Sequence, residues 1–191
     1  MAITPDPVPA RPLYGLAVQR IVVMGISGCG KSTLATALAR HLGWPMIEGD
    51  ALHPPENIAA MQAGQALTDD MRLPWLTRIA DRMEIILRHH ATGVVASCSA
   101  LKRIYRQVRE RHGPVLFLHL ILPVDAAHAR MISRKGHFMS PLLADSQAAI
   151  LEPLGSGENG LDLDAAADPD QLLQHAMEWI TFIPGRYNLT I

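Results

Sequence analysis

The sequence predicts an α/β fold in which a parallel β-sheet is covered by helices on both faces. Short, β-branched apolar segments alternate along the chain with longer segments of helical periodicity, and a glycine-rich loop joins the first such strand to the first helix. This alternation is typical of parallel sheets that bind ligands at the carboxyl ends of their strands. The 191 residues suffice for one domain with a substantial core.

The first half of the chain is expected to supply three of the strands. Each strand is short, apolar and rich in Val or Ile, whereas the helices repeat apolar residues every three or four positions, as Leu34 and Leu38 do. Gly43 and Gly64 are typical helix ends, and Pro74 is expected to open the longest helix. In order, we expect a strand at 19–24, a helix at 31–42, a strand at 44–49, a helix at 54–64, a helix at 74–93 and a strand at 94–97.

The second half is expected to add two strands and four helices. The helix at 100–112 is predicted to bury Leu101, Ile104, Tyr105 and Val108 and to turn Lys102, Arg106 and Arg109 to the other side. The remaining expected elements are a strand at 115–122, a helix at 125–135, a loop at 136–144, a helix at 145–151, a turn at 155–160, a strand at 161–164 and a helix at 169–180. A proline-rich tail at 1–17 and a tail at 182–191 flank a single domain at 18–181.

Composition limits the classes of partner. The net charge is −1, so no general basic field attracts nucleic acid or an anionic membrane surface. Apolar runs are strand-sized rather than membrane-sized, and the N-terminal residues lack the pattern of a signal peptide. Two cysteines make neither a disulfide framework nor a metal site. We therefore expect a cytoplasmic protein that binds neither nucleic acid nor membrane.

The glycine-rich loop matches G-x-x-x-x-G-K-[ST], the signature of a phosphate-binding loop (P-loop), between a strand and a helix. Its glycines allow the backbone N–H groups to turn inward around phosphates, and the following helix N-terminus adds further donors. Lys31 is expected to reach the β- and γ-phosphates of ATP, and Ser32 to bind Mg²⁺. The predicted nucleotide-binding residues are Gly25, Ile26, Ser27, Gly28, Cys29, Gly30, Lys31, Ser32 and Thr33. Cys29 is either a small residue that fills the loop or a thiol whose modification blocks ATP binding.

A P-loop alone also fits a switch GTPase or a mechanical ATPase, so the acceptor must be inferred elsewhere. Asp50 ends the second predicted strand, beside the P-loop, and His53 follows it. Asp50 is placed to accept a proton from a substrate hydroxyl or to hold Mg²⁺ through water, and the alternative is a solvated turn residue.

Longer motifs resemble the gluconokinase family over about residues 20–181. They are Gly49-Asp50, Leu52-His53-Pro54, Asn57-Ile58, Met61, Gly64, Leu67, Asp69-Asp70, Arg72, Pro74-Trp75-Leu76, Cys98-Ser99-Ala100-Leu101-Lys102, Tyr105-Arg106, Arg134-Lys135-Gly136-His137-Phe138-Met139, Asp145-Ser146-Gln147 and Leu151-Glu152-Pro153. One departure is Ala148, where the family commonly has an aromatic residue. The resemblance implies transfer of phosphate from ATP to the 6-hydroxyl of D-gluconate, a P-loop kinase fold with a five-stranded parallel sheet, a mobile lid at about 130–144, and a homodimer.

The resemblance also suggests roles for individual residues. A substrate carboxylate needs cations, which an Arg fork suits well. The predicted catalytic residues are Lys31, Asp50, Arg130 and Arg134; the predicted substrate-binding residues are Asp50, His53, Arg72, Lys102, Arg106 and His137; and the predicted Mg²⁺ ligands are Ser32 and Asp50. Asp69 and Asp70 either bind sugar hydroxyls or cap the helix that follows them. The competing functions are a kinase for shikimate or a nucleoside monophosphate, and a binding module gated by nucleotide hydrolysis.

Overall fold

The computed structural model describes residues 20–89, 92–133 and 142–182. In these ranges five parallel strands form one sheet in the order β2-β3-β1-β4-β5. The strands are β1 (Arg20–Met24), β2 (Met46–Glu48), β3 (Val94–Ser97), β4 (Leu116–Ile121) and β5 (Gly160–Asp164). The predicted five-stranded parallel α/β fold is confirmed. No helix in the described ranges combines the length and apolar character needed to cross a membrane.

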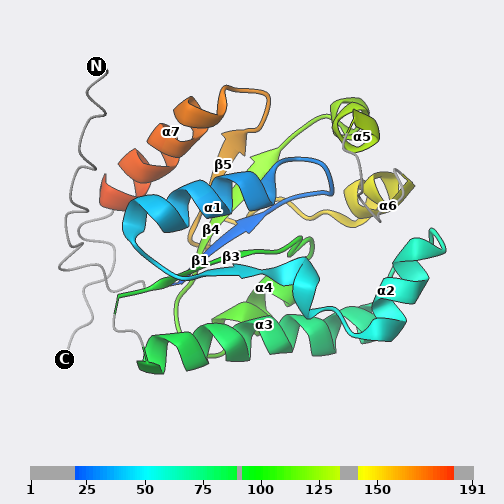
Figure 1. Cartoon of the computed structure of the whole chain (residues 1–191), viewed down its shortest axis with the longest axis horizontal. Helices are drawn as coiled ribbons and strands as arrows, with labels where there is room; N and C mark the ends of the chain where they lie inside the picture. The colour runs from blue at the N-terminus through cyan, green and yellow to red at the C-terminus, as the bar shows by residue number, and fades with distance from the viewer. Residues whose placement is uncertain (1–19, 90–91, 134–141, 183–191) are drawn as a thin grey trace, which may run out of the picture.

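Helices cover both faces of the sheet (Figure 1). They are α1 (Lys31–Leu42), the 3₁₀ turn η1 (Gly49–Leu52), α2 (Pro55–Gln62), α3 (Asp69–His89), α4 (Arg103–Glu110), α5 (Val124–Ser133), α6 (Leu142–Ile150) and α7 (Pro169–Phe182). Helices α1 and α7 lie on one face and α3 and α4 on the other, while α2, α5 and α6 gather around the end of the sheet where the P-loop lies.

The central strand β1 anchors the core. Ile21, Val22, Val23 and Met24 are all fully buried, and each buried side chain of this size contributes about 1.5–3 kcal/mol through removal from water. The parallel register pairs Val23 with Ser97 of β3 and Met24 with a residue of β4. The carboxyl ends of the central strands therefore meet at the N-terminus of α1, which positions the site described below.

Helix α3 begins earlier than the sequence indicated. We expected Pro74 to open it, but the helix starts at Asp69 and contains Pro74 in its second turn. The Thr68 hydroxyl accepts a hydrogen bond from the N–H of Met71 (3.4 Å), and the Thr68 carbonyl accepts one from Arg72 N–H (3.0 Å). A side-chain cap therefore starts the helix, and a proline this close to the start interrupts few of its hydrogen bonds.

The buried face of α4 is only partly the one predicted. Tyr105, and Leu101 just before the helix, are buried as expected. Ile104 is 52% exposed, whereas Arg106 and Arg109, which we expected on the solvent side, are each 1% exposed. Apolar periodicity failed here because a guanidinium that finds several acceptors can be buried in place of an aliphatic side chain.

Candidate active site

The P-loop is held open by main-chain atoms packed beneath its glycines. Gly25, Gly28 and Gly30 have φ angles of 135°, 83° and 104°. A Cβ at Gly25 would lie 2.7 Å from the carbonyl oxygen of Leu120, and one at Gly28 would lie 2.7 Å from that of Ala127. Only glycine fits both the left-handed backbone and this space. Helix α1 then begins at Lys31 with no acidic residue in its first turn and no side-chain cap at Gly30, an arrangement that suits an anion.

Two cations flank the loop. The Lys31 ammonium donates a hydrogen bond to the carbonyl of Ile26 (2.9 Å). The Arg130 guanidinium of α5 donates to the carbonyls of Cys29 (3.4 Å) and Ala165 (2.8 Å). Both charges therefore lie beside the loop that the sequence predicts to bind phosphates.

The Cys29 side chain takes no part in this electrostatic arrangement. It is 1% exposed, and burial raises the pKa of its thiol in spite of the nearby Lys31 and Arg130 charges. A buried, protonated thiol supports the interpretation that Cys29 fills the loop. Among the other predicted nucleotide-binding residues, Ser32 is half-buried in the first turn of α1, and Thr33 is exposed.

A pocket joins the P-loop to the elements that follow β2. It brings together Lys31 with three predicted substrate-side residues, Asp50, His53 and Arg72. Its lining comes from the P-loop, η1, α2, α3, α6 and the segments between them, and consists of Ser27, Lys31, Asp50, His53, Met61, Leu67, Arg72, Ser99, Leu143 and Gln147.

Asp50 and His53 lie together on one wall. The Nε2 atom of His53 is 3.9 Å from Oδ1 of Asp50, and the imidazole stacks on the Trp75 indole with ring centroids 3.9 Å apart. Burial, together with the positive charge of Arg72, lowers the pKa of His53 to about 4. His53 is therefore a neutral imidazole at physiological pH.

Arg72 is a buried cation in the same pocket. It is 3% exposed, its Nε donates to the carbonyl of Leu67 (3.1 Å), and burial lowers its pKa, although a guanidinium keeps its proton in proteins. Among the described residues, no carboxylate forms an ion pair with Arg72. The Asp69 carboxylate acts on Arg72 electrostatically without a direct ion pair, and the Tyr105 ring lies 5.9 Å from its Cζ. A buried cation that is compensated only in this way is suited to bind an anionic group of a ligand.

Comparison with known proteins identifies the family to which the chain belongs. The family model described as shikimate kinase matches residues 27–156. A gluconokinase of Gluconobacter oxydans is 44% identical over 163 residues, which cover 84% of this chain and 90% of the relative. The chain belongs to the gluconokinase family. It is therefore a kinase with a nucleotide-binding P-loop that acts on a small molecule.

Two solved structures agree with this membership of the gluconokinase family. A gluconokinase from Sinorhizobium meliloti is 41% identical, with a TM-score of 0.73 over 84% of this chain and 90% of that one. A sugar kinase from Janibacter sp. HTCC2649 is 43% identical, with a TM-score of 0.80 over 87% of this chain and 96% of that one.

Lys102, which the gluconokinase resemblance placed at the substrate, lies outside the pocket lining. Its ammonium binds both carboxylate oxygens of Asp69 at 2.8 and 3.0 Å, and the Tyr105 hydroxyl donates to the same carboxylate at 2.5 Å. Hydrogen bonds from Lys102 and Tyr105 lower the pKa of Asp69, and the Asp69 hydrogen bond raises that of Lys102. Asp69 thus ties the start of α3 to the start of α4, while Thr68 supplies the cap.

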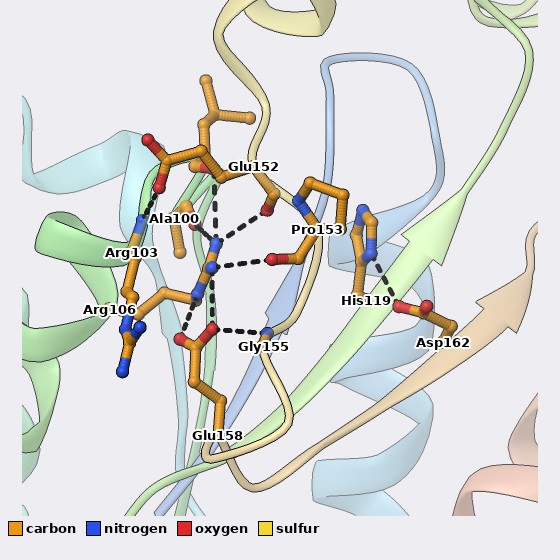
Figure 2. Close-up of polar contacts among 10 residues, drawn as sticks. Ala100, Arg103, Arg106, His119, Glu152, Pro153, Gly155, Glu158 and Asp162 are labelled. Atoms are coloured by element: carbon orange, nitrogen blue, oxygen red, sulfur yellow. Dashed lines mark hydrogen bonds and ion pairs between the residues drawn. The ribbon is translucent and has the colours of Figure 1, made fainter.

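Arg106, another residue taken from the gluconokinase motifs, is committed to the protein itself (Figure 2). Its guanidinium binds both oxygens of Glu158 (2.5 and 2.9 Å) and donates to four main-chain carbonyls, all within 3.1–3.3 Å. These carbonyls belong to Ala100, Leu101, Glu152 and Pro153. Its donors are directed at protein acceptors, which favours a structural role for Arg106 over the predicted binding of substrate.

Two polar pocket residues, Gln147 and Ser99, were not assigned a role from the sequence. The N–H of Ser27 donates to Oε1 of Gln147 on α6 (2.7 Å), so a side chain contacts the P-loop backbone. Ser99 follows β3, and its carbonyl accepts from the N–H of Gly25 (3.3 Å). Both lie in motifs shared with the gluconokinase family, D-S-Q and C-S-A-L-K, and that membership was the only signal that could have found them.

Residues 134–141 of the predicted lid, and two predicted site residues among them, lie outside the described ranges. Arg134 and His137 fall within 134–141, so their roles as catalytic and substrate-binding residues stay predictions.

Proposed function

We propose that the protein transfers the γ-phosphoryl group of ATP to the 6-hydroxyl of D-gluconate. The observation that supports this most strongly is that the P-loop, Asp50 and the buried cation Arg72 line one pocket. Phosphorylation of a hydroxy acid needs a site that binds the phosphate donor, a proton acceptor and a group that binds the carboxylate. The P-loop, Asp50 and Arg72 respectively can meet these needs.

Each residue then has a defined task. Arg72 binds the carboxylate of gluconate and orients the chain of hydroxyls toward the P-loop. The oxygen of the 6-hydroxyl forms the new bond to the γ-phosphorus while the bond between that phosphorus and the ADP oxygen breaks. Asp50 accepts the proton that the hydroxyl loses. Lys31 and Arg130 neutralise charge on the phosphate oxygens, as Arg134 does if the lid closes over them.

Mg²⁺ is the expected metal. Ser32 at the start of α1 and Asp50 across the pocket are the oxygen donors that would hold it, directly or through water, and the ion supplies charge neutralisation at the transferred phosphate. The described residues contain no group of three or more His, Cys, Asp or Glu side chains placed to bind a metal. This scarcity fits Mg²⁺, which is usually held by one or two protein oxygens together with phosphates and water.

A coupled ADP-release assay with MgATP tests the reaction. The acceptors compared are D-gluconate, shikimate, AMP, glucose and none. Shikimate is included because the matching family model carries its name and because it too has a carboxylate and hydroxyls. Stimulation of ADP release by gluconate alone supports the proposal. Stimulation by shikimate alone would make shikimate the acceptor in place of gluconate. Slow ADP release that does not depend on any acceptor would indicate the nucleotide-gated module.

The family resemblance also underlies our proposal of a cytoplasmic homodimer. Light scattering after size-exclusion chromatography measures the mass, and a value for one chain of 20.9 kDa excludes a stable dimer. Cell fractionation tests the location.

A further inference from the structure

Asn57, on α2, contacts the imidazole of His53 from the side away from Asp50. It is 1% exposed. Its amide nitrogen Nδ2 donates to the carbonyl of Met71 (3.0 Å) and lies 3.2 Å from Nδ1 of His53. A main-chain carbonyl can only accept a hydrogen bond, so the atom that faces it must be the nitrogen of the amide. The second hydrogen of that nitrogen is then directed at the imidazole.

This contact determines which imidazole nitrogen carries the proton. Nδ1 must accept the hydrogen bond from Asn57, because a proton on Nδ1 would place two donors face to face. The neutral ring therefore carries its hydrogen on Nε2, the atom that lies 3.9 Å from Oδ1 of Asp50. Stacking on Trp75, whose indole N–H donates to the carbonyl of Gly49 (2.7 Å), fixes the plane of the ring.

The 3.9 Å between Nε2 of His53 and Oδ1 of Asp50 matches the span of one bridging oxygen atom. It is too long for a direct hydrogen bond, whereas an oxygen placed to one side can make hydrogen bonds of about 2.8 Å to both atoms. Such an oxygen would accept from Nε2–H and donate to the carboxylate. A substrate hydroxyl has this combination of groups.

We propose that Asn57 is a positioning residue that holds His53 as the Nε2–H tautomer, so that His53 donates to the acceptor hydroxyl whose proton Asp50 receives. The proposal rests on the proposed phosphoryl transfer. In this proposal His53 orients the nucleophilic oxygen of the acceptor, so that a lone pair of that oxygen is directed at the P-loop. Among the residues that the structure describes, the charged groups near the ring are Asp50 and Arg72, and burial together with the charge of Arg72 keeps the ring neutral.

The tautomer can be observed without any turnover. Long-range ¹H–¹⁵N spectra of the uniformly labelled protein at pH 8 separate the protonated from the unprotonated imidazole nitrogen, and His53→Gln identifies the signals by their loss. We expect Nε2 to be protonated in the wild type. A protonated Nδ1 overturns the proposal, whatever the acceptor proves to be.

Two variants separate this role from simple packing. In Asn57→Asp the carboxylate accepts from Nδ1–H and inverts the tautomer, whereas Asn57→Ala leaves either tautomer possible. At pH 8 we expect kcat to fall about tenfold to a hundredfold in Asn57→Asp and less in Asn57→Ala. We also expect Asn57→Asp to regain activity as the pH falls and the ring gains a second proton, which restores Nε2–H. The wild type should show no such gain.

A structural role alone gives a different pattern. Thermal unfolding temperatures and kcat would then fall in parallel in both variants, without inversion of the tautomer and without recovery at lower pH, and that result refutes the proposal. Kinetics use whichever acceptor stimulates ADP release, so an error in the proposed substrate leaves this test intact. If Asn57→Asp does not fold, the wild-type spectrum and Asn57→Ala still decide the outcome.

Discussion

Replacement of Arg106 by Met tests the reassignment of this residue from substrate binding to structure. The side chain is 1% exposed and makes two hydrogen bonds to the Glu158 carboxylate and four to main-chain carbonyls. Methionine fills much of the space but removes every donor. It leaves Glu158, whose side chain is 7% exposed, without its partner.

The magnitude follows from the buried ion pair. Removal of one partner from such a pair costs about 3–5 kcal/mol in the free energy of unfolding, mainly because the remaining charge is left without compensation. For a domain of this size each kcal/mol lowers Tm by about 2–4 °C, so we expect a loss of roughly 6–20 °C. Arg103→Met is the matched control, since Arg103 is an exposed arginine on the same helix, and it should change Tm little.

Thermal denaturation at pH 7.5, followed by acceptor kinetics below Tm, distinguishes the two roles. The structural role predicts a lowered Tm and a nearly unchanged KM for the acceptor in the molecules that remain folded. An unchanged Tm with a KM raised tenfold or more would refute it and return Arg106 to the substrate site. The double variant with Glu158→Gln should be less destabilised than Arg106→Met alone, because no unpaired carboxylate remains buried.

Other predictions concern the pocket. Asp50→Asn should lower kcat about a hundredfold with nearly unchanged ATP affinity; near-normal turnover in the ADP-release assay would remove Asp50 from the mechanism. Gly28→Ala should weaken ATP binding more than tenfold by calorimetry, because its Cβ meets the packing beneath the loop; an unchanged affinity would contradict the packing. Arg72→Met should lower kcat/KM for gluconate roughly 30- to 150-fold, which corresponds to about 2–3 kcal/mol, with ATP affinity retained. An equal loss of affinity for ATP and for gluconate would contradict the proposed contact of Arg72 with the gluconate carboxylate. Because the pKa of His53 is about 4 when folded and near 6.5 when unfolded, acidification from pH 6.5 to 4 should destabilise the wild type more than His53→Gln in thermal scans; equal losses would refute the low pKa.

The features that sequence predicted well are local ones. The strand and helix periods and the P-loop spacing each involve residues within a few positions, and the parallel sheet then brings Asp50 beside Lys31. Arg106 shows where such reasoning fails. Its acceptors come partly from residues 46 to 52 positions further along the chain, so no local pattern distinguishes it from a solvated arginine.

The role inferred for Asn57 was missed for a related reason. The motif that contains it was recognised, but its function depends on the carbonyl of Met71, fourteen residues away on another helix. A hydrogen bond to a main-chain atom leaves no trace in the type of residue that supplies the atom. The same applies to Thr68, whose cap moved the start of α3 ahead of Pro74.

The two sides of the pocket differ in how freely they can change during evolution. The P-loop glycines are restricted by the main-chain carbonyl oxygens of Leu120 and Ala127, which every amino acid possesses. Substitution of Leu120 or Ala127 therefore creates no space for a side chain at Gly25 or Gly28. The opposite wall is built from the side chains of Asp50, His53 and Arg72, which single mutations can replace. A descendant of this fold can therefore acquire a new acceptor while it keeps its phosphate donor. This asymmetry gives a physical reason why a family model named for shikimate kinase matches a chain whose relatives are named gluconokinases.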